Sequence, residues 1–112
     1  MSPITTHILD VAAGQPARGV AVELDRLSTE SWQSMGRGIT NDDGRVTDLM
    51  EEGELAAGTY RLTFATKPYF DGKCATTFYP EVVVTFCVEA ETEHYHVPLL
   101  LSPFGYSTYR GS

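Results

Sequence analysis

The sequence has no cluster of basic residues, no long apolar run and only two cysteines among its 112 residues. Fifteen Asp and Glu against eight Lys and Arg give a formal net charge of −7, which argues against a nucleic acid or an anionic membrane as partner. No apolar stretch approaches the roughly 20 residues of a membrane span, and the opening MSPITTHILD lacks the features of a secretory signal. The sequence therefore predicts a cytoplasmic protein.

The cysteines themselves carry little chemistry. Cys74 and Cys87 match neither a disulfide framework nor a metal spacing, so reduced thiols are expected. Because it lies within the apolar run VVVTFCV, Cys87 is expected to be a small buried hydrophobic residue.

What the sequence does contain is a series of short apolar segments with a period of two residues, the pattern of β-strands. In GVAVELDRL, for example, Val20, Val22 and Leu24 alternate with polar or small residues. Turn signals such as NDDG and SPFG separate such segments. Other expected strands are ITTHILDV, SWQSMGRGIT, GTYRLTFAT, EVVVTFCVE, EHYHVPLLLS and YSTYRG. This spacing and the chain length predict one all-β domain over residues 1–112, a sandwich or a barrel.

Helix is expected to be scarce. Prolines and a glycine limit KPYFDGKCATTFYP to at most a helical turn, and the acidic TDLMEEGELAAG is a weak candidate. Gly36 and Gly38 indicate a bulge or bend within SWQSMGRGIT, and Pro98, which has no N–H, indicates an edge or bulge.

The segment HYHVPLLLSP is apolar on both faces. Odd-numbered residues from Tyr95 to Leu101 share one face, and His96, Pro98 and Leu100 share the other. In so small a sandwich only one face can meet the domain's own core. The second face is therefore expected to meet another subunit of a homo-oligomer.

Two of the three histidines, His7 and His96, lie on largely apolar strand faces, where a polar side chain needs a partner. One such histidine would most simply be a satisfied core residue, but two favour a site, because imidazole accepts or donates protons near physiological pH. His94 is expected to be solvated. A metal would need a third ligand; Asp10 is the nearby carboxylate, but it fits a turn residue equally well, and no zinc spacing is matched.

Three further polar residues leave alternatives open. Ser112 with a histidine suggests acyl-enzyme chemistry, but no helix terminus or nest accompanies it to form an oxyanion hole. Arg45, directly after the NDDG turn, fits a solvated loop residue. Arg110 lies among hydroxyl-bearing and aromatic residues, so it either pairs with a carboxylate or faces an anion.

Four stretches taken together, THILD, GQPA, NDDGR and HYHVPLLLSPFGYSTYRGS, resemble the transthyretin-like 5-hydroxyisourate hydrolases. The terminal YRGS distinguishes this enzyme family from transthyretin, the thyroid-hormone carrier. The resemblance covers essentially the whole chain and implies a two-sheet sandwich of about eight strands with one short helix. It further implies a homotetramer with active sites at the dimer–dimer interface, hydrolysis of 5-hydroxyisourate to 2-oxo-4-hydroxy-4-carboxy-5-ureidoimidazoline in urate degradation, and neither cofactor nor metal.

Matched motif by motif, the resemblance implies that His7, Arg45, His96 and Ser112 are catalytic, and that His7, Arg45, Tyr109 and Ser112 bind the substrate. Water would add to the C6 carbonyl; one neutral imidazole would activate it while the other orients the substrate or supplies a proton, and the sequence does not choose between them. Arg45 would stabilise negative charge, and Ser112 would position a histidine or the water through its hydroxyl or terminal carboxylate. The alternative is a transthyretin-like carrier of a small aromatic ligand without catalysis.

Overall fold

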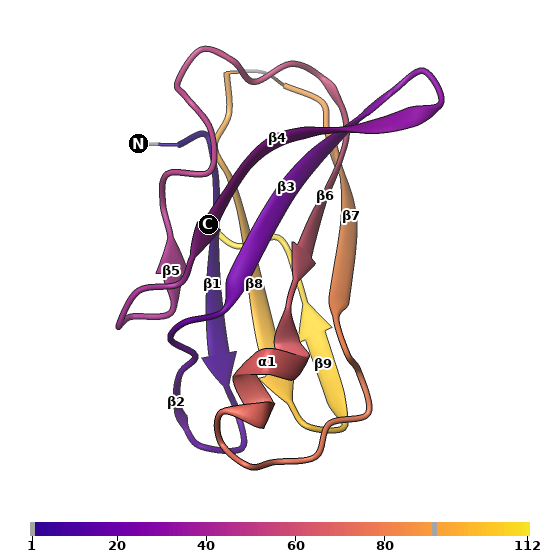
Figure 1. The fold of residues 1–112 in the computed structure, drawn as a ribbon. Coiled ribbons are helices and arrows are strands. Elements are labelled where there is room, and N and C mark those ends of the chain that lie inside the picture. Colours follow the sequence, from indigo (N-terminus) through magenta and orange to yellow (C-terminus); the bar gives the residue numbers. More distant parts are fainter. Residues whose placement is uncertain (1, 91) are drawn as a thin grey trace.

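The computed structural model describes residues 2–90 and 92–112, which form a sandwich of two packed β-sheets (Figure 1). In the first sheet, β1 (Ile4–Asp10) pairs with β8 (Tyr95–Ser102), which pairs with β9 (Gly105–Thr108), and the short strands β2 (Gln15–Pro16) and β5 (Arg45–Val46) lie on β1. The second sheet has the order β4 (Ser31–Ile39), β3 (Ala21–Ser28), β6 (Gly58–Phe64) and β7 (Val82–Val88). This architecture confirms the predicted two-sheet, all-β fold.

One short helix, α1 (Thr66–Asp71), follows β6 and lies at one end of the sandwich (Figure 1). It begins one residue before KPYFDGKCATTFYP, the segment expected to hold at most a helical turn, whereas the acidic residues 47–57 contain turns and bends and no helix. Pro68 fits in the first turn, where an N–H has no helical acceptor, and buried Phe70 attaches the helix to the core. Within the described ranges, no helix is both long enough and apolar enough to cross a bilayer.

Burial follows the period of two that the sequence predicts. In β8, Tyr95, Val97, Leu99 and Leu101 are at most 6% exposed, while His96 and Leu100 are only partly buried. The inner faces of both sheets supply the core in this way. Its main side chains are Ile4, Ile8, Val22, Leu24, Tyr60, Leu62, Phe64, Val82, Val88, Tyr95, Val97, Leu99 and Leu101.

The glycine-rich part of β4 contains the irregularity that the sequence predicts. The register between β3 and β4 shifts between Leu24 and Asp25, which pair with Gly36 and Ser34. Met35 is therefore the extra residue of a bulge. Gly36 also allows close packing, since a Cβ there would lie 1.7 Å from the carbonyl oxygen of Leu49.

Cys87 contradicts the expectation of a buried thiol. It is exposed, because it shares the outward face of β7 with Val83 and Thr85. Its place in an apolar run predicts burial, yet the tertiary fold covers only the other face of β7. Cys74 and Cys87 are both free thiols.

The sequence predicts an edge or a bulge at Pro98, but β8 is an interior strand that runs between β1 and β9. The β8–β9 pairing ends at Leu99 and Thr108 and returns only as a single bridge between His96 and Gly111. Pro98 falls in the gap between these pairs, where its missing N–H breaks no ladder hydrogen bond. The gap also explains why β9 ends at Thr108, earlier than predicted.

Candidate active site

Residues from the two ends of the chain lie side by side because β1 and β8 pair in parallel. Thr5 is opposite His96, and His7 is opposite Pro98. Directly opposed residues project from the same face of a sheet, so Thr5, His7 and His96 share the outward face of the first sheet.

Arg45 joins this face through the turn that precedes β5. The Asn41 side-chain oxygen accepts the N–H of Asp43 at 2.9 Å and that of Arg45 at 3.0 Å, which closes the turn. Gly44 has φ +75°, and a Cβ there would lie 2.5 Å from the carbonyl oxygen of Ile8, so the turn requires glycine. The short β5 ladder then sets Arg45 directly opposite His7.

The C-terminal residues reach the same face. The Gly111 N–H donates to the His96 carbonyl oxygen at 2.8 Å, which holds the last two residues beside β8. A pocket of about 210 Å³ opens here, lined by Thr5, Thr6, Arg45, Thr47, His94, His96 and Ser112. The structure thus brings Arg45, His96 and Ser112 together; His7 lies next to Arg45 but outside the lining of this pocket.

The electrostatics of the face favour neutral imidazoles. Burial and the Arg45 guanidinium hold the pKa of His7 below its usual 6.5, against an opposing hydrogen bond to the Asp43 backbone and the Asp43 charge. Burial, then Arg45, then His7 and His94 lower the pKa of His96. Both rings are therefore predominantly unprotonated at pH 7 and able to accept a proton.

Sequence reasoning missed Thr5 and the contact made by His94. The Thr5 Oγ1 lies 2.8 Å from His96 Nδ1 and 3.1 Å from His94 Nε2. The two imidazole rings stack with centroids 6.4 Å apart and an interplanar angle of 22°. His94 is exposed, as expected, but it belongs to this cluster. The available signal was the spacing of two residues between the histidines, which sets both on one face of an extended segment.

Two candidates at the C-terminus lie elsewhere. Tyr109 is 58% exposed and is not among the residues around the histidine pocket. With Thr108 and Arg110 it borders a separate groove of about 260 Å³ beside β7. Arg110 pairs with a carboxylate, one of the two alternatives for it: Nη2 is 3.8 Å from Glu93, and the guanidinium lies 4.4 Å from the centre of the Tyr95 ring.

Asp10 does not join the histidines. It is buried, and its carboxylate accepts hydrogen bonds from the Tyr69 hydroxyl at 2.6 Å, the Ala13 N–H at 2.9 Å and Lys73 Nζ at 3.3 Å. Burial alone would raise the pKa of Asp10, but these hydrogen bonds outweigh it and the pKa is lowered. Of its two alternatives, a metal ligand or a turn residue, Asp10 is therefore the turn residue. Its hydrogen bond with Tyr69 also links β1 to α1. Among the described residues no His, Cys, Asp or Glu side chains form a group of three suited to a metal.

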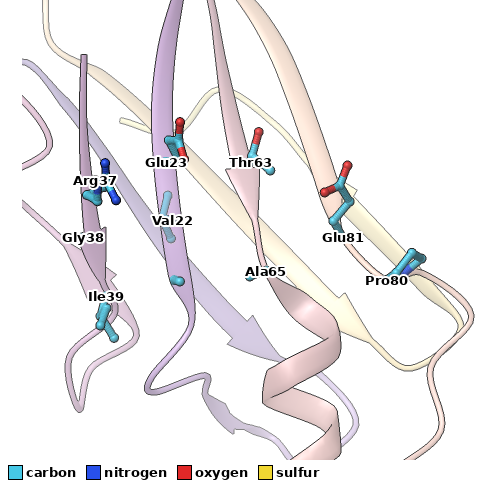
Figure 2. Close-up of a pocket in the computed structure, with 10 residues that line it drawn as sticks. Val22, Glu23, Arg37, Gly38, Ile39, Thr63, Ala65, Pro80 and Glu81 are labelled. Atoms are coloured by element: carbon cyan, nitrogen blue, oxygen red, sulfur yellow. The ribbon is translucent and has the colours of Figure 1, made fainter. Parts of the chain in front are cut away.

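A wider hollow of about 650 Å³ lies on the outer face of the second sheet. Figure 2 shows Glu23 of β3, Arg37 of β4 and Thr63 of β6 around it, with Glu81 at the start of β7. It holds no imidazole, so it lacks the proton-transfer group that distinguishes the face of β1 and β8.

The fold is that of a transthyretin-like protein. The solved structure of sea bream transthyretin in complex with thyroxine superposes with a TM-score of 0.93 at 34% identity, over 98% of this chain and 95% of that one. The 5-hydroxyisourate hydrolase of Salmonella dublin is 48% identical over 109 residues, 97% of this chain and 80% of that protein. That of Mus musculus is 45% identical over 113 residues, 99% of this chain and 96% of that protein. The chain belongs to the HIUase/Transthyretin family, whose model matches residues 4–111.

Proposed function

We propose that this chain hydrolyses 5-hydroxyisourate to 2-oxo-4-hydroxy-4-carboxy-5-ureidoimidazoline, a step of urate degradation, by histidine-assisted attack of water on the C6 carbonyl. The observation that carries the proposal is the grouping of Arg45, His96 and Ser112 around one pocket, with His7 beside Arg45. Relatives at 45% to 48% identity that are named 5-hydroxyisourate hydrolases support the same activity.

In the proposed reaction, water adds to C6, a tetrahedral oxyanion forms, and the N1–C6 bond breaks as N1 takes up a proton. The water proton goes to a neutral imidazole, and the lowered pKa values of His7 and His96 suit both rings for this task. The second imidazole orients the substrate or supplies the proton to N1.

Arg45 stabilises the oxyanion with its fork of N–H donors. Its guanidinium forms no ion pair with a carboxylate among the described residues, so its donors are available to a ligand. Ser112 positions a histidine or the attacking water; Tyr109 has no place in this pocket, because within the chain it borders the separate groove beside β7.

A homotetramer with its active sites at the dimer–dimer interface is part of the proposal. Leu100 and His96 on the outward face of β8 are only partly covered within one chain. A second subunit over this face would bury them and exclude water from the reacting atoms. Sedimentation equilibrium should give the mass of a tetramer; a monomer with full activity would rule this assembly out.

The deciding assay generates 5-hydroxyisourate from urate with urate oxidase and follows its absorbance. Added protein should accelerate the decay well beyond the spontaneous rate and give the ring-opened product by NMR; an unchanged rate would exclude the hydrolase. The second candidate is a carrier of a small aromatic ligand, favoured by the TM-score of 0.93 to a transthyretin solved with thyroxine. Calorimetric binding of thyroxine without acceleration of the decay would support the carrier instead.

A further inference from the structure

We propose that Thr5 and His94 control which ring nitrogen of His96 carries its proton, so that His94 acts as a switch on the basicity of His96 toward the pocket. The inference rests on the proposed function, in which a neutral imidazole activates water. It assigns positioning roles to two residues that lie outside the set His7, Arg45, His96 and Ser112.

The geometry that supports this is a three-membered hydrogen-bonded chain. Thr5 Oγ1 lies between His94 Nε2 at 3.1 Å and His96 Nδ1 at 2.8 Å. A hydroxyl has one hydrogen to donate and lone pairs with which to accept. It can therefore donate to one of these nitrogens only, and it must accept from the other if both contacts are to be hydrogen bonds.

Two arrangements satisfy the chain. In the first, His96 Nδ1–H donates to Thr5, the Thr5 hydroxyl donates to His94 Nε2, and His96 Nε2 is left with a free lone pair. In the second, His94 Nε2–H donates to Thr5, Thr5 donates to His96 Nδ1, and the His96 proton is on Nε2. Only the first arrangement leaves His96 Nε2 able to accept a proton from water in the pocket.

Protonation of His94 selects the second arrangement. A charged imidazole has N–H on both nitrogens, so His94 Nε2 can then only donate to Thr5. The Thr5 hydrogen turns to His96 Nδ1; the former Nδ1 proton of His96 leaves to water, and water returns one to Nε2. The balance is one proton taken up from solvent, at His94, which is exposed and can exchange protons with it.

The other charged and titratable groups around His96 leave this chain intact. Arg45 on β5 and His7 on β1 act on His96 through their charges. Gly111 binds only the His96 carbonyl oxygen, at 2.8 Å. Thr5 itself is 4% exposed, so its hydroxyl is held away from bulk water and depends on the two rings for partners.

The direct test is ¹⁵N NMR of the histidine rings in the resting protein, without substrate. On acidification the ring spectra should show neutral His96 in the Nδ1–H form where His94 is neutral, and in the Nε2–H form where both His94 nitrogens carry a proton. In His94→Ala this change of tautomer should disappear, while the matched exposed control Thr92→Ala should behave as wild type. A His96 tautomer that is unaffected by His94→Ala would overturn the switch.

Kinetics give a second readout. Thr5→Val keeps the shape but removes the hydroxyl, and should lower kcat by about 10- to 100-fold with little change in KM, whereas Thr5→Ser should restore most of it. On the acid side of the pH profile, the slope of log kcat against pH should be smaller by one proton in His94→Ala than in the wild type. Full kcat in Thr5→Val, with an unchanged limb in His94→Ala, contradicts the proposal. The NMR result stands apart from hydrolysis, so a protein that shows the tautomer change but no hydrolysis would refute only the proposed function.

Discussion

In the second sheet β3 and β4 form a hairpin and β6 pairs with β7, its neighbouring strand in the chain, whereas in the first sheet β1 pairs in parallel with β8. The hydrogen bond between Thr5 and His96 joins residues 91 positions apart in the chain. The first sheet also contains two strands of two residues each and a proline in an interior strand. The second sheet is the more regular of the two, and the first one carries the imidazoles.

The outer faces differ in the same way. The second sheet presents Glu23, Arg37 and Glu81, whose charges are suited to a solvated surface (Figure 2). The first presents His7 and His96, whose pKa values are lowered chiefly by burial. The irregular features of the first sheet therefore lie at the histidine face. The two-residue β5 sets Arg45 opposite His7, and Gly111 pairs with His96 beyond the gap at Pro98.

The largest expected effect comes from removing the imidazoles. His7→Asn or His96→Asn should each lower kcat by about 10²- to 10⁴-fold, because general acid–base catalysis contributes that much. Initial rates of 5-hydroxyisourate decay measure this, with thermal unfolding to verify that the fold and the assembly are retained. The matched substitution on the other sheet, Glu81→Gln, should leave both measurements unchanged. Wild-type turnover in either histidine variant would remove that residue from the catalytic roles.

The second largest effect on kcat is expected from Arg45→Gln. Loss of an oxyanion donor costs about 10²- to 10³-fold in kcat. The charge of Arg45 lowers the pKa of both His7 and His96, so its removal lets both values rise. The acid limb of kcat/KM, which lies below pH 6.5 in the wild type, should then move to higher pH. Arg45→Lys keeps the charge but not the fork of donors, so it should lose rate without moving the limb; an equal shift in both variants would disprove the electrostatic coupling.

Gly111→Ala tests how closely the C-terminus fits the site. A Cβ at this position would lie 2.7 Å from His96 Cδ2 and 3.1 Å from Pro98 Cγ, so the imidazole must move. We expect kcat to fall by about tenfold or more, because small displacements of catalytic groups are costly. Gly105→Ala, at the start of β9, meets only the Ser102 hydroxyl at 3.7 Å and should retain wild-type kcat. Equal rates in the two variants would mean that the terminal residues do not position His96.

The regular sheet was predictable because its signals are local. The period of two in residues 20–27 and the glycines of β4 depend on neighbours in the chain, and the strands and the bulge were found where they indicated. The prediction that Cys87 is buried was wrong because an apolar run does not indicate which of its faces the fold will cover. On the first sheet the same local reasoning identified β1 and β8 but not their parallel pairing.

The site required more than periodicity. The strand pattern singled out His7 and His96, but Arg45 and Ser112 were assigned to the site only through the resemblance to a family. The register that opposes Thr5 to His96 is set by long-range pairing, so the role of Thr5 had no local signal. For Pro98 the sequence predicts an edge or a bulge. Its missing N–H is instead accommodated by an interruption of the β8–β9 ladder, which only the three-dimensional pairing reveals.

The smallest effect on catalysis, and a clear effect on stability, is expected from Asp25→Asn in the second sheet. Asp25 is 5% exposed, and its carboxylate accepts a hydrogen bond from Arg61 Nε at 3.0 Å, while the guanidinium lies 4.3 Å from the centre of the Trp32 ring. Removing the charge should cost about 1–2 kcal/mol of unfolding free energy, since the hydrogen bond from Arg61 loses its charged acceptor while Arg61 keeps access to water. Thermal unfolding should record a Tm lower by roughly 5 °C, with kcat within about twofold of wild type because no group in the histidine pocket is touched. A loss of kcat at temperatures where the variant is fully folded would show that the second sheet is coupled to the site. Catalysis would then depend on both sheets and not on the histidine face alone.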